Sequence, residues 1–244
     1  MSSLDTARQH AREVVSGICD IILQDYKKGS DDRLGRLSMS DMGSCERKMR
    51  YKLDGLPQTN TPPSIGSLWD GRLYHEDTQA ILKRIFGDNF RSVEDKVKAK
   101  MGEAELSGHV DGVLDRDGES YLVEIKTFND FGWRKRYDSF DRDKGYRHQL
   151  NTYLHALGLQ YAIIIMRKKS FQEWDSIVIE YDPVLFKETS DSVGRVIKTP
   201  PELLPRIDPD KKGSLHWMCN YCPYLTKCWG NGIVKASPNK WRIQ

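Results

Sequence analysis

The positions of the cysteines constrain the fold of this chain more than any other feature. Cys45 stands alone near the N-terminus, whereas Cys219, Cys222 and Cys228 lie together near the C-terminus. If these four side chains bind one metal centre, the fold must bring the two ends of the chain together. A fifth cysteine, Cys19, falls outside this pattern, and we expect it to be a small buried or half-buried thiol.

The composition is that of a folded protein rather than a disordered or membrane-spanning one. The chain has 244 residues, of which 38% are hydrophobic, and this is enough for one sizeable core. No segment approaches the roughly 20 apolar residues of a transmembrane helix, and the N-terminal MSSLDTARQH has no apolar signal core. We therefore expect a cytoplasmic protein, in which an odd number of cysteines favours metal ligation over disulfides.

Charge is distributed unevenly along the chain. The formal net charge is only +3, but the segment after Asp210 contains basic and aromatic residues and no acidic residue. Such a segment can bind a phosphate backbone and stack on bases, with Trp217 and Tyr221 as candidate DNA contacts. The alternative is that its aromatic side chains pack around a metal cluster.

The first third of the chain has apolar residues at helical spacing, which predict three helices: residues 4–28, residues 40–55 and residues 64–87. We expect the first to be an ordinary core helix, with a docking surface as the alternative. Ser40 is the expected N-cap of the second, which carries Cys45. The third contains His75, which on its own indicates no function.

The pattern then changes to short β-rich runs between residues 89 and 128, which predict an antiparallel meander. Further elements follow as a helix, two strands and a helix: residues 144–157, 160–168, 174–182 and 183–198. This mixed order predicts an α/β or α+β fold with a central mixed sheet flanked by helices.

The segment SYLVEIKTF contains the residues that point most directly to chemistry. Side chains alternate along a strand, so Glu124 and Lys126 project to one face. A hairpin across the DRDGE turn brings Asp111, in the preceding strand, close to Glu124. Two carboxylates with a lysine beside them suit Mg²⁺ or Mn²⁺ and the hydrolysis of a phosphodiester, in which Lys126 orients or deprotonates the attacking water. A solvated strand face is the alternative for the Glu–x–Lys pair alone.

The helix after this strand adds polar side chains to the same region. Gln149 and Tyr153 lie four residues apart on one helix face, with Arg147 nearby. Residues 133–147 hold six basic residues against three acidic ones, which predicts a strand-binding lip, with a solvated charged loop as the alternative. The candidate DNA contacts in this region are Arg134, Lys135, Arg136 and Arg147.

Together these motifs resemble the PD-(D/E)xK nuclease superfamily, in its RecB-like exonuclease branch. The similarity lies in the aspartate of GHVDGVL, the ExK pattern, the QxxxY pattern and the upstream histidine of GRLYHE: Asp111, Glu124 to Lys126, Gln149 to Tyr153, and His75. The resemblance implies a restriction-endonuclease-like core. It also implies a role for each residue: metal binding by His75, Asp111, Glu124 and the carbonyl of Ile125, catalysis by Lys126, and substrate positioning by Gln149 and Tyr153.

The cysteine spacing resembles the iron–sulfur members of that branch, which include CRISPR-associated exonucleases and AddB-type nuclease domains. This implies a [4Fe–4S] cluster on Cys45, Cys219, Cys222 and Cys228, although four thiolates also suit Zn²⁺. The expected organisation is a single nuclease domain over residues 1–244. Its cluster lobe would comprise residues 40–55 and 215–231, and its nuclease core residues 64–199.

The resemblance implies a metal-dependent DNA exonuclease that acts on single strands or duplex ends, with 5′ to 3′ polarity, in recombination, repair or CRISPR adaptation. Endonuclease or flap-cutting activity stays open. The alternative function is a DNA-end-binding subunit of a larger recombination, repair or CRISPR-adaptation complex, with protein partners and little activity of its own.

Overall fold

The computed structural model describes residues 3–58, 65–170, 173–237 and 240–243. The chain divides into two compact units, which we call the sheet unit and the terminal unit. The sheet unit comprises Gly35–Leu56 and Gly71–Asp208, and the terminal unit comprises Met1–Leu34, Pro57–Asp70 and Pro209–Gln244. Residues 40–55 and most of the predicted nuclease core fall in the sheet unit, so the functional residues of that core can be described together.

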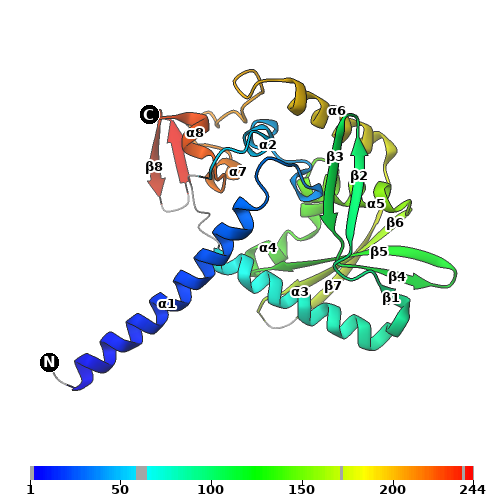
Figure 1. Ribbon diagram of the computed structural model, residues 1–244, viewed down its shortest axis with the longest axis horizontal. Helices are drawn as coiled ribbons and strands as arrows, with labels where there is room; N and C mark the ends of the chain where they lie inside the picture. The colour runs from blue at the N-terminus through cyan, green and yellow to red at the C-terminus, as the bar shows by residue number, and fades with distance from the viewer. Residues whose placement is uncertain (1–2, 59–64, 171–172, 238–239, 244) are drawn as a thin grey trace. The chain divides into compact units, whose positions relative to one another are not determined.

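A five-stranded mixed sheet forms the centre of the sheet unit (Figure 1). Its strands, in spatial order, are β1 (Phe90–Arg91), β4 (Gly112–Arg116), β5 (Glu119–Phe128), β6 (Tyr161–Lys168) and β7 (Trp174–Glu180). β5 and β6 are parallel, and the other neighbours are antiparallel. These strand directions confirm the predicted mixed sheet. A helix between β5 and β6 provides the crossover connection that a parallel pair needs.

Helices cover both faces of this sheet. On one face, Leu82 and Phe86 of α3 (Ile65–Phe86) pack with Val123 and Ile125. On the other face, Leu150 and Leu154 of α5 (Gly145–Leu157) pack against apolar side chains of the two central strands. These are Leu122 of β5 and Ala162, Ile164 and Met166 of β6. Glu124 and Lys126 have the parity of Leu122, so the strand alternation directs them toward α5.

The predicted meander is wrong in one respect. The segment LSGHVDGVL does not form one strand but divides at Val110 and Asp111. Its first part, β3 (Ala104–His109), pairs with β2 (Lys96–Met101) in a separate hairpin, and its second part becomes β4. The hairpin buries Ala99, Met101 and Leu106 in the core beside α5.

The second predicted helix begins later than expected. A short 3₁₀ turn (Met39–Asp41) comes first, and α2 (Glu46–Leu53) starts after Cys45, which is its N-cap in place of Ser40. Gly43 separates the two with a φ of +71°, where a side chain would collide with Gly145. The left-handed backbone at Gly43 ends the first turn, so one continuous helix cannot form.

α2 is attached to α6 (Pro183–Lys198), and to the segment that follows α6, through arginine side chains. Arg50 Nη1 donates to the carbonyl of Val196 at 3.1 Å, and Arg47 Nε donates to the carbonyl of Leu204 at 3.1 Å. Carbonyls at the end of a helix have no partner within the helix, and cationic donors satisfy them well. The element that carries Cys45 is therefore fixed to the core of the sheet unit.

The shorter elements of the sheet unit are 3₁₀ turns at Gly87–Asn89 and Tyr137–Phe140 and the helix α4 (Asp130–Arg134). The elements of the terminal unit are α1 (Ser3–Asp31), α7 (Trp217–Asn220), α8 (Leu225–Trp229), β8 (Ile233–Ser237) and β9 (Lys240–Ile243). In the part of the chain that the structure describes, no helix combines the length and apolar character needed to cross a membrane.

Two predictions for α1 are wrong. Val14, Ile18 and Ile21 are 63%, 56% and 57% exposed, and the Cys19 thiol is exposed as well. The small apolar cluster of the terminal unit forms from other residues, namely Leu215, Leu225 and Ile233. The apolar periodicity of α1 predicted the helix correctly but did not make it part of that core.

Candidate active site

Glu124 and Lys126 form the buried centre of the site on β5. Glu124 is 3% exposed, and the ammonium of Lys126 donates a hydrogen bond to its Oε1. Gln149 of α5 donates to the same oxygen at 3.3 Å. Strand alternation and the helix packed on this face therefore bring three of the predicted residues together.

Asp111 lies at the bend between β3 and β4, rather than inside a strand as predicted. Its Oδ2 accepts a hydrogen bond of 2.6 Å from the backbone N–H of Ile125. Gly112 pairs with Val123 in the antiparallel register, so Asp111 stands next to Glu124 at the end of the β4–β5 ladder. The expected closeness of the two carboxylates follows from this register.

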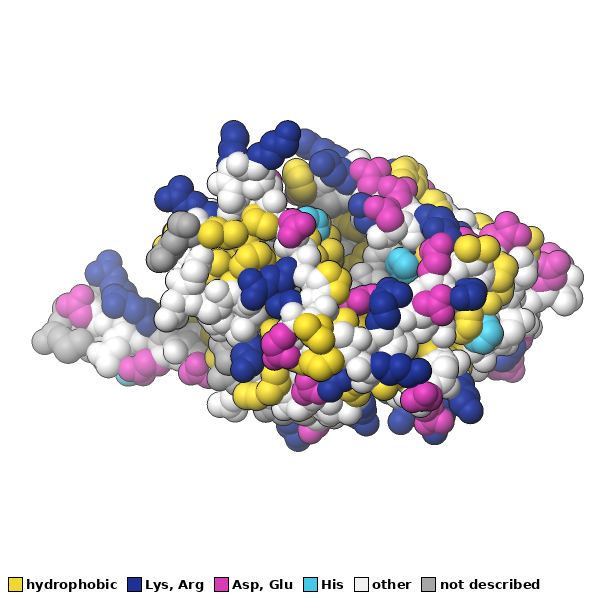
Figure 2. All heavy atoms as spheres, turned by 90° about the horizontal axis from the view of Figure 1, so that it is seen from above, with side chains coloured by type: hydrophobic (Ala, Val, Ile, Leu, Met, Phe, Trp, Pro, Cys, Tyr) yellow, Lys and Arg dark blue, Asp and Glu magenta, His cyan; other side chains and the backbone are white. Residues whose placement is uncertain are grey.

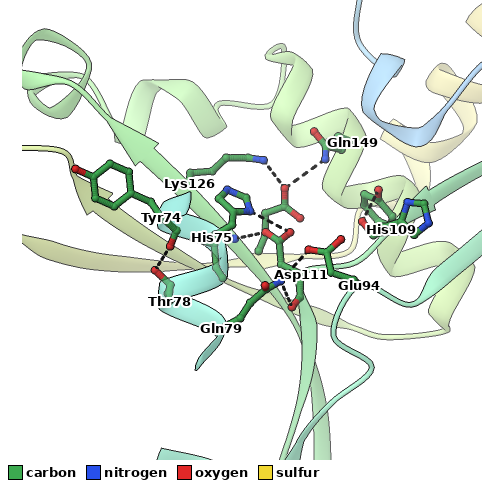
Figure 3. A network of polar contacts seen from close by, with 12 residues as sticks. Tyr74, His75, Thr78, Gln79, Glu94, His109, Asp111, Lys126 and Gln149 are labelled. Atoms are coloured by element: carbon green, nitrogen blue, oxygen red, sulfur yellow. Dashed lines mark hydrogen bonds and ion pairs between the residues drawn. The ribbon is translucent and has the colours of Figure 1, made fainter. Parts of the chain in front are cut away.

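α3 supplies two side chains to Asp111, one helical turn apart. His75 Nδ1 lies 3.3 Å from Asp111 Oδ1. Gln79 Nε2 donates to the backbone carbonyl of Asp111 at 3.1 Å and to Glu94 Oε1 at 2.9 Å. Figure 3 shows His75 and Gln79 pointing from the helix toward Asp111, with Lys126 and Gln149 converging from the other elements.

Glu94 has an unusual backbone conformation, with a φ of +58°. A left-handed residue other than glycine is costly and persists only where its surroundings hold it. Here the N–H of Glu94 donates to the carbonyl of Val110 at 2.9 Å, and its side chain accepts from Gln79. The loop after β1 is thus tied to the residue before Asp111.

Tyr153 has a different position from Gln149, although both lie on α5. It is buried, and its hydroxyl donates to the backbone carbonyl of His109 at 2.9 Å. A Cβ at Gly108 would overlap the Tyr153 hydroxyl, and a Cβ at Gly112 would overlap the ring of Phe90. The glycines on both sides of Asp111 therefore admit two rings that hold this segment in place.

Burial and neighbouring charges shift the pKa values of the central groups. Burial raises the pKa of the Glu124 carboxyl, and the negative charge of Asp111 adds to this, although Lys126 opposes it. Burial lowers the pKa of the Lys126 ammonium, but the charges of Glu124 and other neighbours outweigh burial and raise it above its usual value. Lys126 is accordingly protonated at neutral pH, which suits charge stabilisation better than proton abstraction.

The side chains of Asp111, Glu124 and His75 suit a hard cation, although within the described residues they do not form a complete set of metal ligands. Within the described residues, no group of three or more His, Cys, Asp or Glu side chains is arranged to hold a metal ion. His75 and Asp111 are nevertheless in contact, and the negative charge of Asp111 adds to the repulsion at Glu124, whose pKa is raised mainly by burial. A divalent cation would relieve that repulsion, and oxygen ligands suit Mg²⁺ or Mn²⁺.

The four cysteines of the predicted cluster are distributed over both units. Cys45 belongs to the sheet unit, whereas Cys219, Cys222 and Cys228 belong to the terminal unit. All four are half-buried, and the N–H of Cys222 donates to the carbonyl of Cys219 at 3.1 Å. The last three cysteines thus lie within one compact turn region around α7 and α8.

The predicted DNA contacts differ in exposure. Arg134 and Lys135 are exposed on α4 and just after it, and Trp217 is 62% exposed in the terminal unit, where Tyr221 is also exposed. Arg136 is paired with Asp175, and Arg147 is half-buried and donates to the carbonyl of Glu180 at 3.0 Å. Over much of the face seen in Figure 2, basic and acidic side chains are interspersed.

Three residues of the site were not predicted from the sequence: Gln79, Glu94 and Tyr146. The ring of Tyr146 lies 4.8 Å from Lys126 Nζ. Gln79 follows His75 by four residues, and this helical spacing is the one signal that could have indicated it. Glu94 had no such signal, because its role depends on how its loop lies against Val110.

By sequence, no protein-family model and no curated protein matches this chain. Solved structures of similar fold include the protein SSO0001, with a TM-score of 0.56 and 19% identity over 86% of this chain and 96% of its own. LHK-Exo, an alkaline exonuclease from Laribacter hongkongensis, has a TM-score of 0.50 and 17% identity over 68% of this chain and 88% of its own. A phage-related exonuclease from Haemophilus somnus 129PT has a TM-score of 0.51 and 12% identity over 69% and 94%.

At these identities the similarity shows the fold alone. The chain shares with these exonucleases a mixed sheet flanked by helices.

Proposed function

We propose that the protein is a divalent-cation-dependent DNA exonuclease. The observation that carries this proposal is the convergence of Asp111, Glu124 and Lys126 on one buried spot, with His75 and Gln149 bonded to them. The shared fold with alkaline and phage-related exonucleases supports it. A purely structural role would not require two carboxylates and a lysine to be buried together, because such burial is costly.

The chain's own residues suggest a division of labour. Asp111 and Glu124, with His75 and the carbonyl of Ile125, would hold Mg²⁺ or Mn²⁺. Such a cation polarises a phosphoryl oxygen and lowers the pKa of a bound water. The protonated Lys126 would stabilise the negative charge that develops on the phosphate. Gln149 would orient the Glu124 carboxylate, and Tyr153 would hold the segment that carries Asp111.

We further propose that Cys45, Cys219, Cys222 and Cys228 bind a [4Fe–4S] cluster, with Zn²⁺ as the alternative. Thiolate ligands suit both. The half-buried state of all four thiols and the tight turn between Cys219 and Cys222 support this assignment. The preference for iron rests on the resemblance to iron–sulfur nucleases.

Cleavage of end-labelled DNA tests the nuclease. Anaerobically purified protein is incubated with single-stranded and duplex DNA in Mg²⁺, Mn²⁺ or EDTA, and with circular single-stranded DNA that has no ends. We expect cation-dependent release of short products from linear DNA, and the order in which a 5′ or 3′ label is lost gives the polarity. Cleavage of the circle would indicate an endonuclease instead.

Lys126→Ala provides the matched test of the site, with the exposed Lys83→Ala on α3 as control. We expect the first to lose activity and the second to retain it. Tight DNA binding without cleavage under every cation would favour a DNA-end-binding subunit over an enzyme.

A further inference from the structure

The first turn of α5 adds a third side chain to the face of this helix that lies along the site. Tyr146, Gln149 and Tyr153 follow the spacing i, i+3 and i+7, which places them on one side of a helix. Gln149 donates to Glu124, and Tyr153 donates to the carbonyl two residues before Asp111. Two members of the row therefore support the two carboxylates of the site, one each. Tyr146 lies at the open end of the row, because it is 40% exposed whereas Tyr153 is 3% exposed.

Tyr146 contacts the lysine of the site rather than a carboxylate. The Lys126 ammonium lies 4.8 Å from the centroid of the Tyr146 ring, which is within the range of a cation–π contact. The same ammonium donates to Oε1 of Glu124, where it meets the amide of Gln149 (Figure 3). A lysine side chain is a flexible four-carbon stem, so one ion pair leaves the position of its ammonium loosely defined. A second partner from another element, α5, defines that position more closely.

The ring of Tyr146 is itself held by other aromatic side chains. It stacks on Phe140 with a centroid distance of 5.7 Å and an interplanar angle of 29°. Phe140 is buried and meets Phe128 edge-on at 6.5 Å. Phe128 is the last residue of β5, two positions after Lys126 and on the same face of the strand. The ring is therefore anchored to the strand that carries the lysine.

We propose that Tyr146 is a positioning residue, whose ring holds the Lys126 ammonium beside the reacting phosphate and whose hydroxyl is not required. An aromatic ring attracts a cation through its quadrupole and has no net charge. The ring therefore keeps its attraction for the ammonium when the charge of Glu124 is shared with a divalent cation, whereas the ion pair between Glu124 and Lys126 weakens. This inference rests on the proposed nuclease function and names a further residue of the same site.

The variants Tyr146→Phe and Tyr146→Leu separate the ring from the hydroxyl. Phenylalanine keeps a ring beside the ammonium, whereas leucine keeps an apolar side chain against Phe140 but has no ring. With saturating end-labelled DNA and Mn²⁺, we expect kcat to stay within about 2-fold of wild type in Tyr146→Phe and to fall by about 5-fold to 30-fold in Tyr146→Leu. Tyr121→Leu, which changes a tyrosine toward the other end of β5, is the matched control and should leave kcat unchanged.

Binding of DNA in EDTA shows whether Tyr146 acts through Lys126 or on the substrate. Fluorescence anisotropy would measure the Kd of the full-length protein for the same labelled DNA. We expect the Kd of both Tyr146 variants to stay within about 2-fold of wild type, because a residue that acts only on the reaction lowers kcat and leaves binding in place. Weaker binding by Tyr146→Leu with an unchanged kcat would assign the ring to the substrate and overturn the positioning role.

The contact between the ring and the ammonium can be measured without metal and without cleavage. Protons above the face of an aromatic ring resonate upfield, so the NMR signals of isotopically labelled lysine report on this contact in the full-length protein. The signal of the Lys126 ε-methylene is the one that disappears in Lys126→Ala. We expect this signal to keep its position in Tyr146→Phe and to move downfield in Tyr146→Leu.

The outcomes distinguish this inference from the proposed function on which it rests. If the wild-type protein cuts DNA, an unchanged kcat or an unmoved Lys126 signal in Tyr146→Leu would overturn the positioning role alone. A loss of kcat in Tyr146→Phe as large as in Tyr146→Leu would also overturn it, because the hydroxyl would then be the group required. Failure of the wild-type protein to cut any DNA with any divalent cation would overturn the nuclease proposal, and the catalytic role of Tyr146 with it.

Discussion

The carboxylate of Asp111 accepts a hydrogen bond of 2.6 Å from the backbone N–H of Ile125, the residue between Glu124 and Lys126. This bond joins the bend before β4 directly to the strand that carries the other central residues. Because the N–H of Ile125 is buried, it needs an acceptor whatever the chemistry of the site. Asp111 therefore has a structural role as well as a proposed catalytic one, and the two can be separated.

The variants Asp111→Asn and Asp111→Ala should separate the structural role of Asp111 from its proposed catalytic role. Asparagine keeps an oxygen that can accept from Ile125 but loses the negative charge, whereas alanine loses both. We expect both variants to lose more than about 100-fold in cleavage rate. The alanine variant should also be less stable than the asparagine variant by about 1–3 kcal/mol, since it leaves a buried donor without a partner. Equal stability of the two in urea unfolding would contradict the role of this bond.

Gln79 should act on the reaction through Asp111 rather than on DNA binding. Gln79→Met keeps the size of the side chain but removes the donor shared by the Asp111 carbonyl and Glu94. We expect kcat at saturating DNA to fall by about 10-fold to 100-fold, with little change in the Kd measured in EDTA. Gln160→Met, which changes an exposed glutamine of the same unit, is the matched control. A loss of DNA affinity with unchanged kcat would show that Gln79 does not position Asp111.

The sequence predicted most of the elements because their local signals agree with their tertiary environment. α6 begins at Pro183 after the Asp182 cap, whose side chain accepts from the N–H of Leu185 at 2.9 Å, and both residues are standard start signals. The alternation of SYLVEIKTF likewise fixed the side chains of Glu124 and Lys126 on one face. To predict that both residues lie close to Asp111, only the register of the hairpin was needed in addition.

What could not be predicted depends on contacts between distant segments. The break at Asp111 is set by Tyr153 and Phe90, which fill the spaces left by Gly108 and Gly112, and neither ring is near in sequence. The backbone of Glu94 is held by Val110 in the same way. α1 shows the converse. Its apolar periodicity specifies a helix but does not specify what packs against the apolar face of that helix.

His148 should make the stability of the protein depend on pH near neutrality. It is half-buried on α5, with its Nδ1 2.8 Å from Thr189 Oγ1, and burial lowers the pKa of its imidazole below the usual value. The unfolded chain therefore binds a proton at higher pH than the folded chain. Stability is fully present above the unfolded pKa of about 6.5 and is lost as pH falls below it toward the folded pKa.

We therefore expect the melting temperature to fall between about pH 7.5 and pH 5.5, and this fall to be smaller in His148→Gln. His10→Gln, which changes an exposed histidine of α1, is the matched control and should leave the pH dependence unchanged. Identical pH profiles for wild type and His148→Gln would show that another group is responsible.

Cys222→Ala tests whether the cysteines join the two ends of the chain. Cys45 and Cys219 are separated by 174 positions in the sequence, from residue 45 to residue 219. A cluster that closes a loop of this length removes much conformational freedom from the unfolded chain, so its loss should cost on the order of 5 kcal/mol. We expect Cys222→Ala to lose bound iron and to melt at a lower temperature. Cys19→Ala, at an exposed thiol on α1, should keep both properties. Bound zinc in place of iron would identify the alternative metal, and an unchanged melting temperature after loss of the metal would contradict the stabilising role of the cluster.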